Sequence, residues 1–257
     1  MGSVRVIRGS EISDVRSAVS TGRWTRKVID VDDRLAINIA RNEPKAISGW
    51  HHHGDSVGCV YVLRGQVRIE WGPGGRDIAK LSTGDFYVLD PRTIHRESNP
   101  GPDDHVLIAF AMGTGRKFIE ADGPAPDGGS TREAGALRVA RGGDLAAGPE
   151  THGMARDVTE VSESVSIGRT RNAPRTISGW HHHGDHTTCV YDIRGRTRIE
   201  WGPGGRERAE VEAGDFYIIY PNTIHREGNP GTDDQMIAGF FIGRGTSVVN
   251  VDGPEGG

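Results

Sequence analysis

The chain has 257 residues, enough for one large domain or for two of about 125 residues each. Only 35% of the residues are hydrophobic, and no stretch is apolar for long enough to cross a bilayer. The formal net charge is −4 with mixed signs and no basic stripe, so we expect neither nucleic acid nor a membrane as a partner. No apolar core precedes a cleavage site near residue 1, so we expect no secretory leader.

Cysteine usage points to a reducing compartment. The chain has two cysteines, Cys59 and Cys189, at equivalent places in its two halves. Two cysteines could form a single bridge, but they cannot form a disulfide framework. We therefore expect a cytoplasmic protein with two buried, inert thiols.

Internal repetition organises the whole chain. The segment SGWHHHGDSVGCVYVLRGQVRIEWGPGGRD at 48–77 reappears with few changes at 178–207, and 84–104 reappears at 214–234. The offset, 48 to 178, is 130 residues, which is too long for a solenoid repeat, so each copy should be a complete domain. We predict one domain over 1–124, a linker rich in Gly, Ala and Pro over 125–136, and a second domain over 137–257.

Short strands separated by turn signals follow one another within each copy. In the first copy, a histidine-rich run at 51–53 precedes CVYVLRG at 59–65 and QVRIEW at 66–71, which meet at a tight Arg-Gly turn. The glycine-rich stretch at 72–77 is a second turn, and DFYVLDP at 85–91 is a strand that ends at proline. No segment has the apolar spacing of a helix, so the pattern predicts a β-sandwich or β-barrel.

Three consecutive histidines stand in each copy. In the first copy, alternation along a strand should point His51 and His53 one way and His52 the other. A His-x-His pair can place two imidazoles on one metal ion, and the third ligand must then come from elsewhere. The repeated His95 is the candidate, because eight of the eleven histidines occupy repeated positions. The predicted ligand sets are His51, His53 and His95 in the first copy and His181, His183 and His225 in the second.

These motifs resemble those of the cupin superfamily, and two copies make the chain similar to a bicupin. The histidine pair at 51–53 and Gly65 match the first cupin motif. Gly84, His95 and Asn99 match the second motif, and the second copy repeats both matches. The resemblance covers nearly the whole chain outside the linker. It implies an all-β protein made of two tandem jelly-roll barrels, each holding a divalent metal ion near its mouth.

The usual glutamate ligand of this family is missing. Its place is taken by Gly58 in the first copy and by Thr188 in the second. Both sites then resemble the three-histidine members of the superfamily, which include iron dioxygenases. The carboxylates that could replace the glutamate are Asp55 and Asp185, for which a turn role is the alternative, and Glu97 and Glu227, which could instead orient an imidazole.

The expected function is that of a metal-dependent enzyme acting on a small, polar, anionic molecule. Three neutral ligands keep the site positive and leave positions open for a chelating anion and dioxygen. The resemblance favours an Fe²⁺ dioxygenase with one ion per barrel, with Mn²⁺, Ni²⁺, Zn²⁺ and Cu²⁺ as alternatives. A non-redox enzyme such as an isomerase or a decarboxylase, or a ligand-binding module, is the alternative function. The acid–base candidates are Glu97, Glu227 and Tyr220, together with Asp55.

The two copies differ where a cavity is expected. Val62 becomes Asp192, and Asp90 becomes Tyr220, so the second cavity should be the more polar one. We expect both halves to bind metal and one half to turn over substrate. Either a monomer or a homodimer is expected, because exposed sheet edges can pair within one chain or between two.

Overall fold

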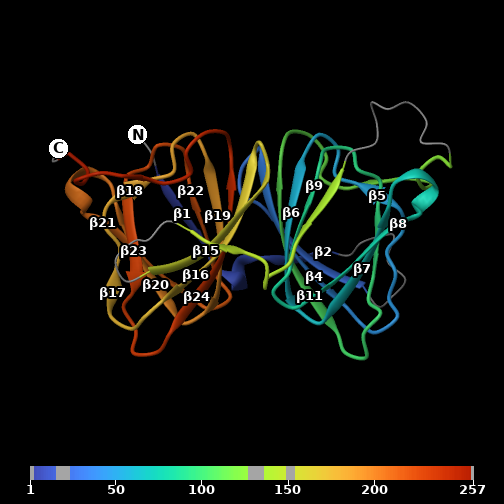
Figure 1. Ribbon diagram of the computed structural model, residues 1–257, viewed down its shortest axis with the longest axis horizontal. Coiled ribbons are helices and arrows are strands. Elements are labelled where there is room, and N and C mark those ends of the chain that lie inside the picture. Colours follow the sequence, from blue (N-terminus) through green and yellow to red (C-terminus); the bar gives the residue numbers. More distant parts are fainter. Residues whose placement is uncertain (1–2, 16–23, 127–135, 149–153, 256–257) are drawn as a thin grey trace. The chain divides into compact units, whose positions relative to one another are not determined.

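The computed structural model describes residues 3–15, 24–126, 136–148 and 154–255 (Figure 1). Within these ranges the regular elements are β-strands and three short 3-10 turns: η1 (Gly9–Glu11), η2 (Pro73–Gly75) and η3 (Pro203–Gly205). The predicted all-β fold is therefore confirmed. None of the described helical turns has the length and apolarity needed to cross a membrane. Most of the predicted linker lies outside the described residues.

The chain separates into two compact units. We call Ile12–Asp144 the first barrel, and we call Met1–Glu11 together with Leu145–Gly257 the second barrel. The strands of the first barrel are β2 (Ser13–Val15), β3 (Trp24–Asp30), β4 (Leu35–Asn42), β5 (His51–His52), β6 (Val57–Arg64), β7 (Gln66–Trp71), β8 (Asp77–Ser82), β9 (Phe86–Leu89), β10 (Arg96–Ser98), β11 (His105–Met112), β12 (Ile119–Glu120) and β13 (Leu137–Ala140). Those of the second barrel are β1 (Val4–Ile7), β14 (Ala146–Ala147), β15 (Met154–Ser162), β16 (Val165–Asn172), β17 (Thr176–Ile177), β18 (His181–His182), β19 (Thr187–Arg194), β20 (Arg196–Trp201), β21 (Glu207–Glu212), β22 (Phe216–Ile219), β23 (His225–Asn229), β24 (Gln235–Ile242) and β25 (Val249–Asn250).

Antiparallel sheets form the first barrel. The larger has the order β13-β9-β6-β11-β4-β3-β2, a smaller one has the order β10-β7-β8, and β5 pairs with β12. The predicted Arg-Gly turn is confirmed, since β6 ends at Arg64, β7 begins at Gln66, and Gly65 adopts φ +83°. A Cβ on Gly65 would lie 2.9 Å from the Cα of His105, so both the backbone angle and the packing require glycine here.

The second barrel repeats this arrangement. Its larger sheet has the order β1-β22-β19-β24-β16-β15-β14, and its smaller sheet has the order β21-β20-β23-β18-β25, with β17 added beside β23. Gly195 takes φ +88° at the turn between β19 and β20, where Gly65 stands in the first barrel. The sequence repeat is therefore also a structural repeat.

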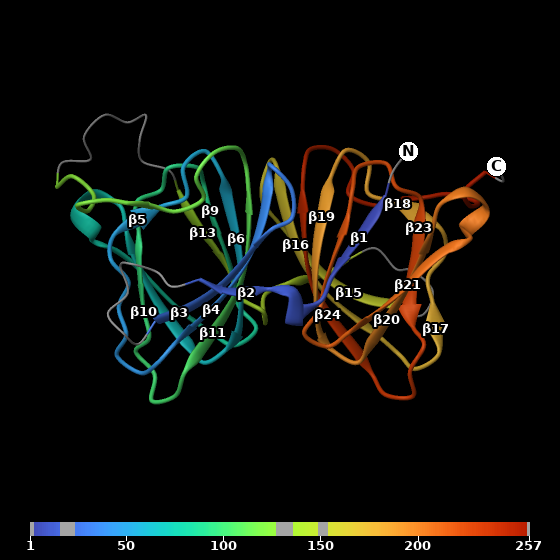
Figure 2. The ribbon, with the colours of Figure 1, turned by 180° about the vertical axis from the view of Figure 1, so that it is seen from behind.

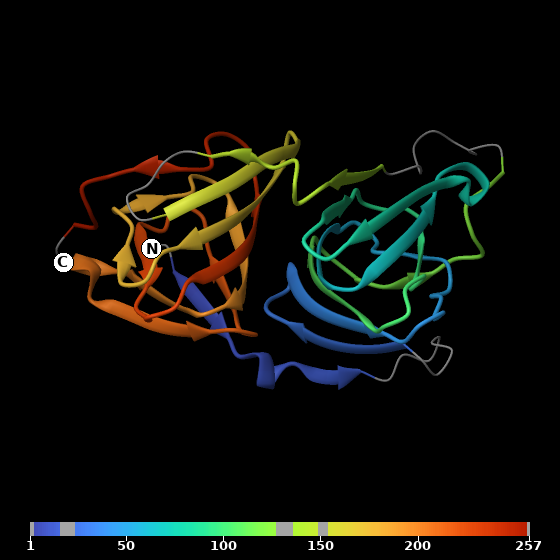
Figure 3. The ribbon, with the colours of Figure 1, turned by 60° about the horizontal axis from the view of Figure 1, so that its bottom comes forward.

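Two strands lie in the opposite barrel from the one that the sequence boundaries predict. The boundaries assign 4–9 to the first domain and 137–142 to the second. In the structure β1, the blue strand in Figure 3, pairs with β22 of the second barrel (Figure 1), and β13 pairs with β9 of the first barrel (Figure 2). The two segments read VRVIRG and LRVARG. Because they are so similar, either could complete either sheet, and the sequence pattern alone does not assign them.

Each exchanged strand is fastened by the same interaction. Arg8 forms an ion pair with Asp215 at 2.6 Å, and Arg141 forms one with Asp85 at 2.9 Å. The carboxylate also accepts a backbone hydrogen bond from the glycine that follows each arginine, at 2.9 and 3.0 Å. The Arg-Gly pair that ends each segment is therefore an anchor for the strand before it.

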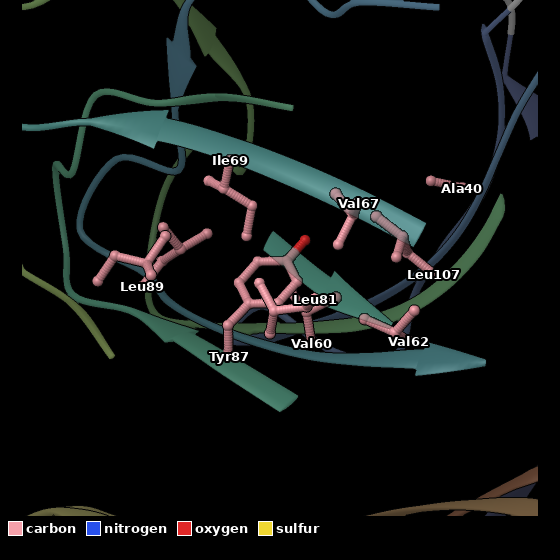
Figure 4. Packing of buried hydrophobic residues seen from close by; sticks show 10 residues of the cluster. Ala40, Val60, Val62, Val67, Ile69, Leu81, Tyr87, Leu89 and Leu107 are labelled. Carbon is pink, nitrogen blue, oxygen red and sulfur yellow. The ribbon is translucent and has the colours of Figure 1, made fainter. Parts of the chain in front are cut away.

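Alternating side chains along the strands build the core of each barrel. In the first barrel Val67 and Ile69 point inward from β7 and pack with Leu81, Tyr87 and Val60 (Figure 4). The core of the second barrel contains the equivalent residues Val190, Ile199, Val211, Tyr217, Ile219 and Ile237. This alternation is the one that the sequence VRIEW predicts for half-buried strands.

A polar group interrupts the core of the second barrel. Asp192 is fully buried and accepts a hydrogen bond of 2.5 Å from Thr197, which in turn contacts the amide of Gln235. Burial raises the pKa of Asp192 to about 7, although the hydrogen bonds from Thr197 and Gln235 act in the opposite direction. Val62 and Val67 hold the corresponding places in the first barrel, so this carboxyl group belongs to the second barrel alone.

We predict that Asp192→Asn reduces the loss of stability with rising pH. The folded-state pKa, about 7, lies above the unfolded value of about 3.9, so between these pH values only the folded state keeps the proton. Stability should therefore fall by up to about 1.4 kcal/mol per pH unit over this range, and the amide of the variant, which does not titrate, would remove that slope. Urea unfolding of both proteins from pH 5 to pH 8 measures the difference. Equal slopes would contradict the prediction.

Candidate metal centres and their cavities

Three histidines converge in the first barrel. His51 lies on β5 and forms a backbone bridge with His95, with N to O distances of 3.0 and 2.9 Å. Their ring centroids are 4.3 Å apart, and the ring of His53 lies 5.3 and 5.1 Å from those of His51 and His95. One ring nitrogen from each of the three lies within 4.8 Å of the others, so the group could hold a metal ion.

The second barrel has the same triad. His181 on β18 pairs with His225 on β23, and their ring centroids are also 4.3 Å apart. His183 completes the group, at 5.1 and 4.9 Å from the other two rings. We call His51, His53 and His95 the first triad, and His181, His183 and His225 the second triad.

Hydrogen bonds fix the orientation of every ring in the first triad. Nδ1 of His51, His53 and His95 lies 3.0, 2.7 and 2.9 Å from the carbonyl oxygens of Gly49, Lys117 and Thr93, respectively. A carbonyl can only accept, so each Nδ1 carries the proton and each Nε2 keeps its lone pair. The second triad makes the equivalent bonds to Gly179, Ser247 and Thr223.

Burial keeps these imidazoles neutral. It lowers the pKa of His53 to about 3 and that of His95 to about 4, and it is also the largest cause of the lowered pKa values of His51, His181, His183 and His225. The Nε2 atoms of His95, His181 and His225 are buried without a hydrogen-bond partner. Three inward lone pairs of neutral imidazole are the donor set that Zn, Cu, Fe and Ni accept, so both triads fit a divalent ion.

Neither centre gains a carboxylate from the aspartates considered above. Asp55 is exposed and forms an ion pair with Arg92 at 2.7 Å, and Asp185 accepts a hydrogen bond from Asn222 at the surface. Both therefore have the turn role that was the alternative for them. Gly58 leaves no side chain at the usual glutamate position, while Thr188 is buried there with an unpartnered hydroxyl.

A carboxyl group does lie close to each triad. Glu97 is buried and accepts a hydrogen bond of 2.5 Å from the hydroxyl of Tyr87. Glu227 and Tyr217 form the same pair at 2.7 Å in the second barrel. The glutamates are thus held by Tyr87 and Tyr217, which none of the sequence motifs indicated.

Tyr220 is not brought to the second cavity. It lies just beyond β22, its backbone N–H donates to Ser3, and its side chain does not line the cavity beside the second triad. Tyr220 replaces Asp90 of the first copy, but the tyrosine that contacts Glu227 is Tyr217. Tyr217 lies within β22, whereas Tyr220 follows the last residue of that strand. The two differ in strand parity, because they are separated by an odd number of positions.

A buried arginine accompanies each glutamate. Arg26 lies on β3, and burial lowers its pKa while the charge of Glu97 opposes this shift. Its guanidinium lies 4.4 Å from the ring of Phe118, which stacks on His51 at 4.5 Å. Arg156 occupies the equivalent place near Glu227. The repeat itself could have indicated both arginines, because Arg26 and Arg156 are separated by the same offset as the two copies.

The cavities beside the two triads differ in size. The first has a volume of about 90 Å³ and is lined by His53, Arg26, Asn38 and Ala111, among others. The second, about 20 Å³, is lined by His183, Arg156, Gly168 and Phe241 among others. Phe241 replaces Ala111 at the repeat offset, and its ring lies 5.0 Å from that of His183.

Asp192 does not make the second cavity more polar than the first, although the sequence comparison of the two copies predicted that it would. Asp192 belongs to the buried core cluster with Thr197 and does not line the second cavity. The second cavity therefore differs from the first by the bulky Phe241 and by the polar side chains of Thr170, Thr188 and Glu227, and not by Asp192. A volume of about 20 Å³ holds little more than one water molecule.

The comparisons with known proteins agree with this architecture. The profile of the cupin domain family matches residues 38–110 and 168–242, which together make up more than half of the chain. The chain belongs to the cupin family. With one match in each barrel it is a bicupin, as the sequence motifs predicted.

Solved structures support the same fold. A formate complex of oxalate decarboxylase from Lactobacillus farciminis is similar with a TM-score of 0.74 and 11% identity, covering 96% of this chain and 88% of that one. Bacillus subtilis oxalate decarboxylase, studied for its Mn(II) centres, gives 0.73 and 14%, covering 96% of this chain and 79% of that one. At this level of identity the likeness shows the fold. No curated protein matched the sequence.

We predict that each triad binds one divalent ion. Replacing His95 or His225 by alanine should lower the metal content from two ions per chain to one, because two neutral ligands hold a divalent ion poorly. His52→Ala is the matched control, since Nδ1 of His52 accepts a hydrogen bond from Gly54 outside the triad. Elemental analysis after desalting checks this. Two ions retained by His95→Ala would contradict the assignment.

Proposed function

We propose that this bicupin is a metal-dependent enzyme whose first barrel decarboxylates a small carboxylic acid. The observation that carries the proposal is the first cavity, which lies between His53 of the triad and the guanidinium of Arg26. A carboxylate in this space can meet a metal ion on one side and a fixed cation on the other. The solved bicupins with a similar fold, which are oxalate decarboxylases, favour this reaction among the alternatives.

The charges around the cavity favour an anion. A guanidinium stays protonated in proteins, and the charge of Glu97 offsets that of Arg26. Because the triad ligands are neutral, the charge of a divalent ion is left without compensation. A dicarboxylate, or a carboxylate with a second oxygen donor, would balance it.

The residues of the chain divide the reaction between them. Arg26 binds and orients the carboxylate, while the apolar wall that includes Val28 and Val60 keeps water out. A divalent ion held by His51, His53 and His95 would supply Lewis acidity for the charge that develops as CO₂ leaves. The electron pair of the broken C–C bond stays on the remaining carbon, which must then receive a proton. Glu97, which is held by Tyr87 and interacts electrostatically with Arg26 and His53 of the cavity wall, is the carboxylate proposed to take up a proton and deliver it to that carbon.

The second barrel is proposed to hold its ion without turnover. Phe241 occupies the side of the second cavity where the first has Ala111, and only water-sized space remains. The second triad keeps every imidazole hydrogen bond of the first. An ion enclosed in this way would stabilise the second barrel, because a ligand that binds only the folded state increases the stability of that state.

Dioxygen-dependent oxidation at the first triad is the second candidate. It is favoured by the three-histidine ligand set without a carboxylate, which is the observation behind the expectation of an iron dioxygenase. Iron and dioxygen would require the same cavity, so the two candidates differ in reaction rather than in place.

We predict that the metal-loaded protein releases CO₂ from a small acid without consuming one equivalent of O₂. Oxalate, malonate and pyruvate should each be tested with Mn²⁺ and with Fe²⁺, recording CO₂ release and O₂ uptake together. Arg26→Gln should lower kcat/KM by at least about tenfold, because it removes the charged partner of the carboxylate. Stoichiometric O₂ uptake would instead favour the oxygenase.

We also predict that turnover depends on the wall of the first cavity and not on the wall of the second. Ala111→Phe should fill the first cavity and abolish turnover while two metal ions remain bound, because Ala111 touches the cavity but is not a ligand. Phe241→Ala, the matched change in the second barrel, should leave turnover unchanged. Metal content and steady-state rates check both variants. Loss of turnover in Phe241→Ala alone would place the reaction in the second barrel.

A further inference from the structure

Two polar atoms of the first cavity have no hydrogen-bond partner. They are Nε of Arg26 and Oδ1 of Asn38, and both are buried. Arg26 is on β3 and Asn38 is on β4, where Asn38 lies opposite Val28 and Arg26 lies opposite Ala40. The two side chains are therefore diagonal neighbours on the same face of the sheet, and both line the cavity.

The unpartnered oxygen of Asn38 needs an explanation. A buried acceptor without a donor costs free energy, and a ligand that supplies the donor recovers it. Within the described residues, the other polar side chains lining the cavity are cations or imidazole: Arg26, Lys117 and His53. Lys117 already donates to the carbonyl of Gly113, and Nδ1 of His53 donates to the carbonyl of Lys117. In the described part of the chain, no side chain of the cavity wall donates a hydrogen bond to Oδ1 of Asn38.

The second barrel lacks this pair. Gly168 stands at the position of Asn38, and a Cβ there would lie 3.8 Å from Cε2 of Phe241. The phenyl ring thus lies where the first barrel has an amide. Asn38 with Ala111 makes a roomy polar wall, and Gly168 with Phe241 makes a filled apolar one. The amide acceptor is thus found in the larger cavity, while the unpartnered hydroxyl of Thr188 lines the smaller one.

We propose that Asn38 and Arg26 select a small acid that carries a hydroxyl on the carbon next to its carboxylate. This inference rests on the proposed function, because it assigns the substrate class of the same cavity. Arg26 donates to the carboxylate, and Oδ1 of Asn38 accepts the hydroxyl hydrogen. A cavity of about 90 Å³ limits the ligand to a few carbon atoms.

Matched pairs of acids test the hydroxyl directly. Tartronate differs from malonate, and glycolate from acetate, by one hydroxyl group on the carbon beside the carboxylate. Calorimetric titration of the Mn²⁺-loaded protein should give a lower Kd for the hydroxylated member of each pair. Asn38→Ala should raise the Kd of tartronate and glycolate by about tenfold, the effect of one lost hydrogen bond, and should change malonate and acetate by less than about twofold.

Three further variants serve as controls. Asn38→Ser keeps an oxygen acceptor and should recover part of the hydroxyl preference, which a merely structural role of Asn38 would not do. Arg26→Gln should weaken all four acids alike. Thr170→Ala, which removes a polar side chain from the second cavity, should leave all four Kd values unchanged. Thermal unfolding and metal content of each variant show whether it is folded and loaded.

The outcomes separate this inference from the proposed function. Binding of malonate and tartronate with equal Kd, or an equal loss of both in Asn38→Ala, overturns the role of Asn38 while the carboxylate site stands. A preference for glyoxylate over glycolate that depends on Asn38 also overturns it, since the amide would then donate to an oxo group. Failure of the wild-type protein to bind any of these acids overturns both proposals.

Discussion

Six hydrogen bonds from imidazole Nδ1 to backbone carbonyl oxygens determine what both centres can do. Each bond fixes a tautomer and turns Nε2 toward the other two rings of its triad. Two of the three acceptors in the first barrel, Gly49 and Thr93, lie two residues before the histidine that they hold. The third belongs to Lys117, just before β12. The donor geometry therefore depends on a closed barrel as well as on local turns.

This constraint explains how two barrels can keep one ligand set and still differ in use. The backbone acceptors do not depend on side-chain identity, so Lys117 can be replaced by Ser247 without loss of the bond. The cavity wall is free to change independently. There, the first barrel has an alanine beside an amide, the second has a phenylalanine beside a glycine, and the phenyl ring leaves a smaller cavity.

The sequence predicted the parts of the site that depend on local spacing. The histidine pair on one short strand and the distant third histidine follow from strand parity and the repeat. Arg26 and Tyr87 did not follow, because they reach the triad through pairing of strands far apart in sequence. The aspartates after the histidine pair were ambiguous for a related reason: regular alternation ends at a turn, where Gly54 has φ +59° and Asp55 faces solvent. The exchange of β1 and β13 could not be predicted either. The two segments are nearly equal in sequence, so either could pair with the edge of either sheet.

The exchange of β1 and β13 has a consequence for the order in which the chain can fold during synthesis. The first barrel is a continuous segment, so it can close as soon as β13 has left the ribosome. β1 is made before the first barrel, but its partner β22 is made after it, since Val4 pairs with Ile219, 219 − 4 = 215 residues later. β1 must therefore wait for β22, and the loop that they close contains the whole first barrel. Once the first barrel is folded, the loop between β1 and β22 is effectively shorter. The entropy cost of pairing these two strands is then lower.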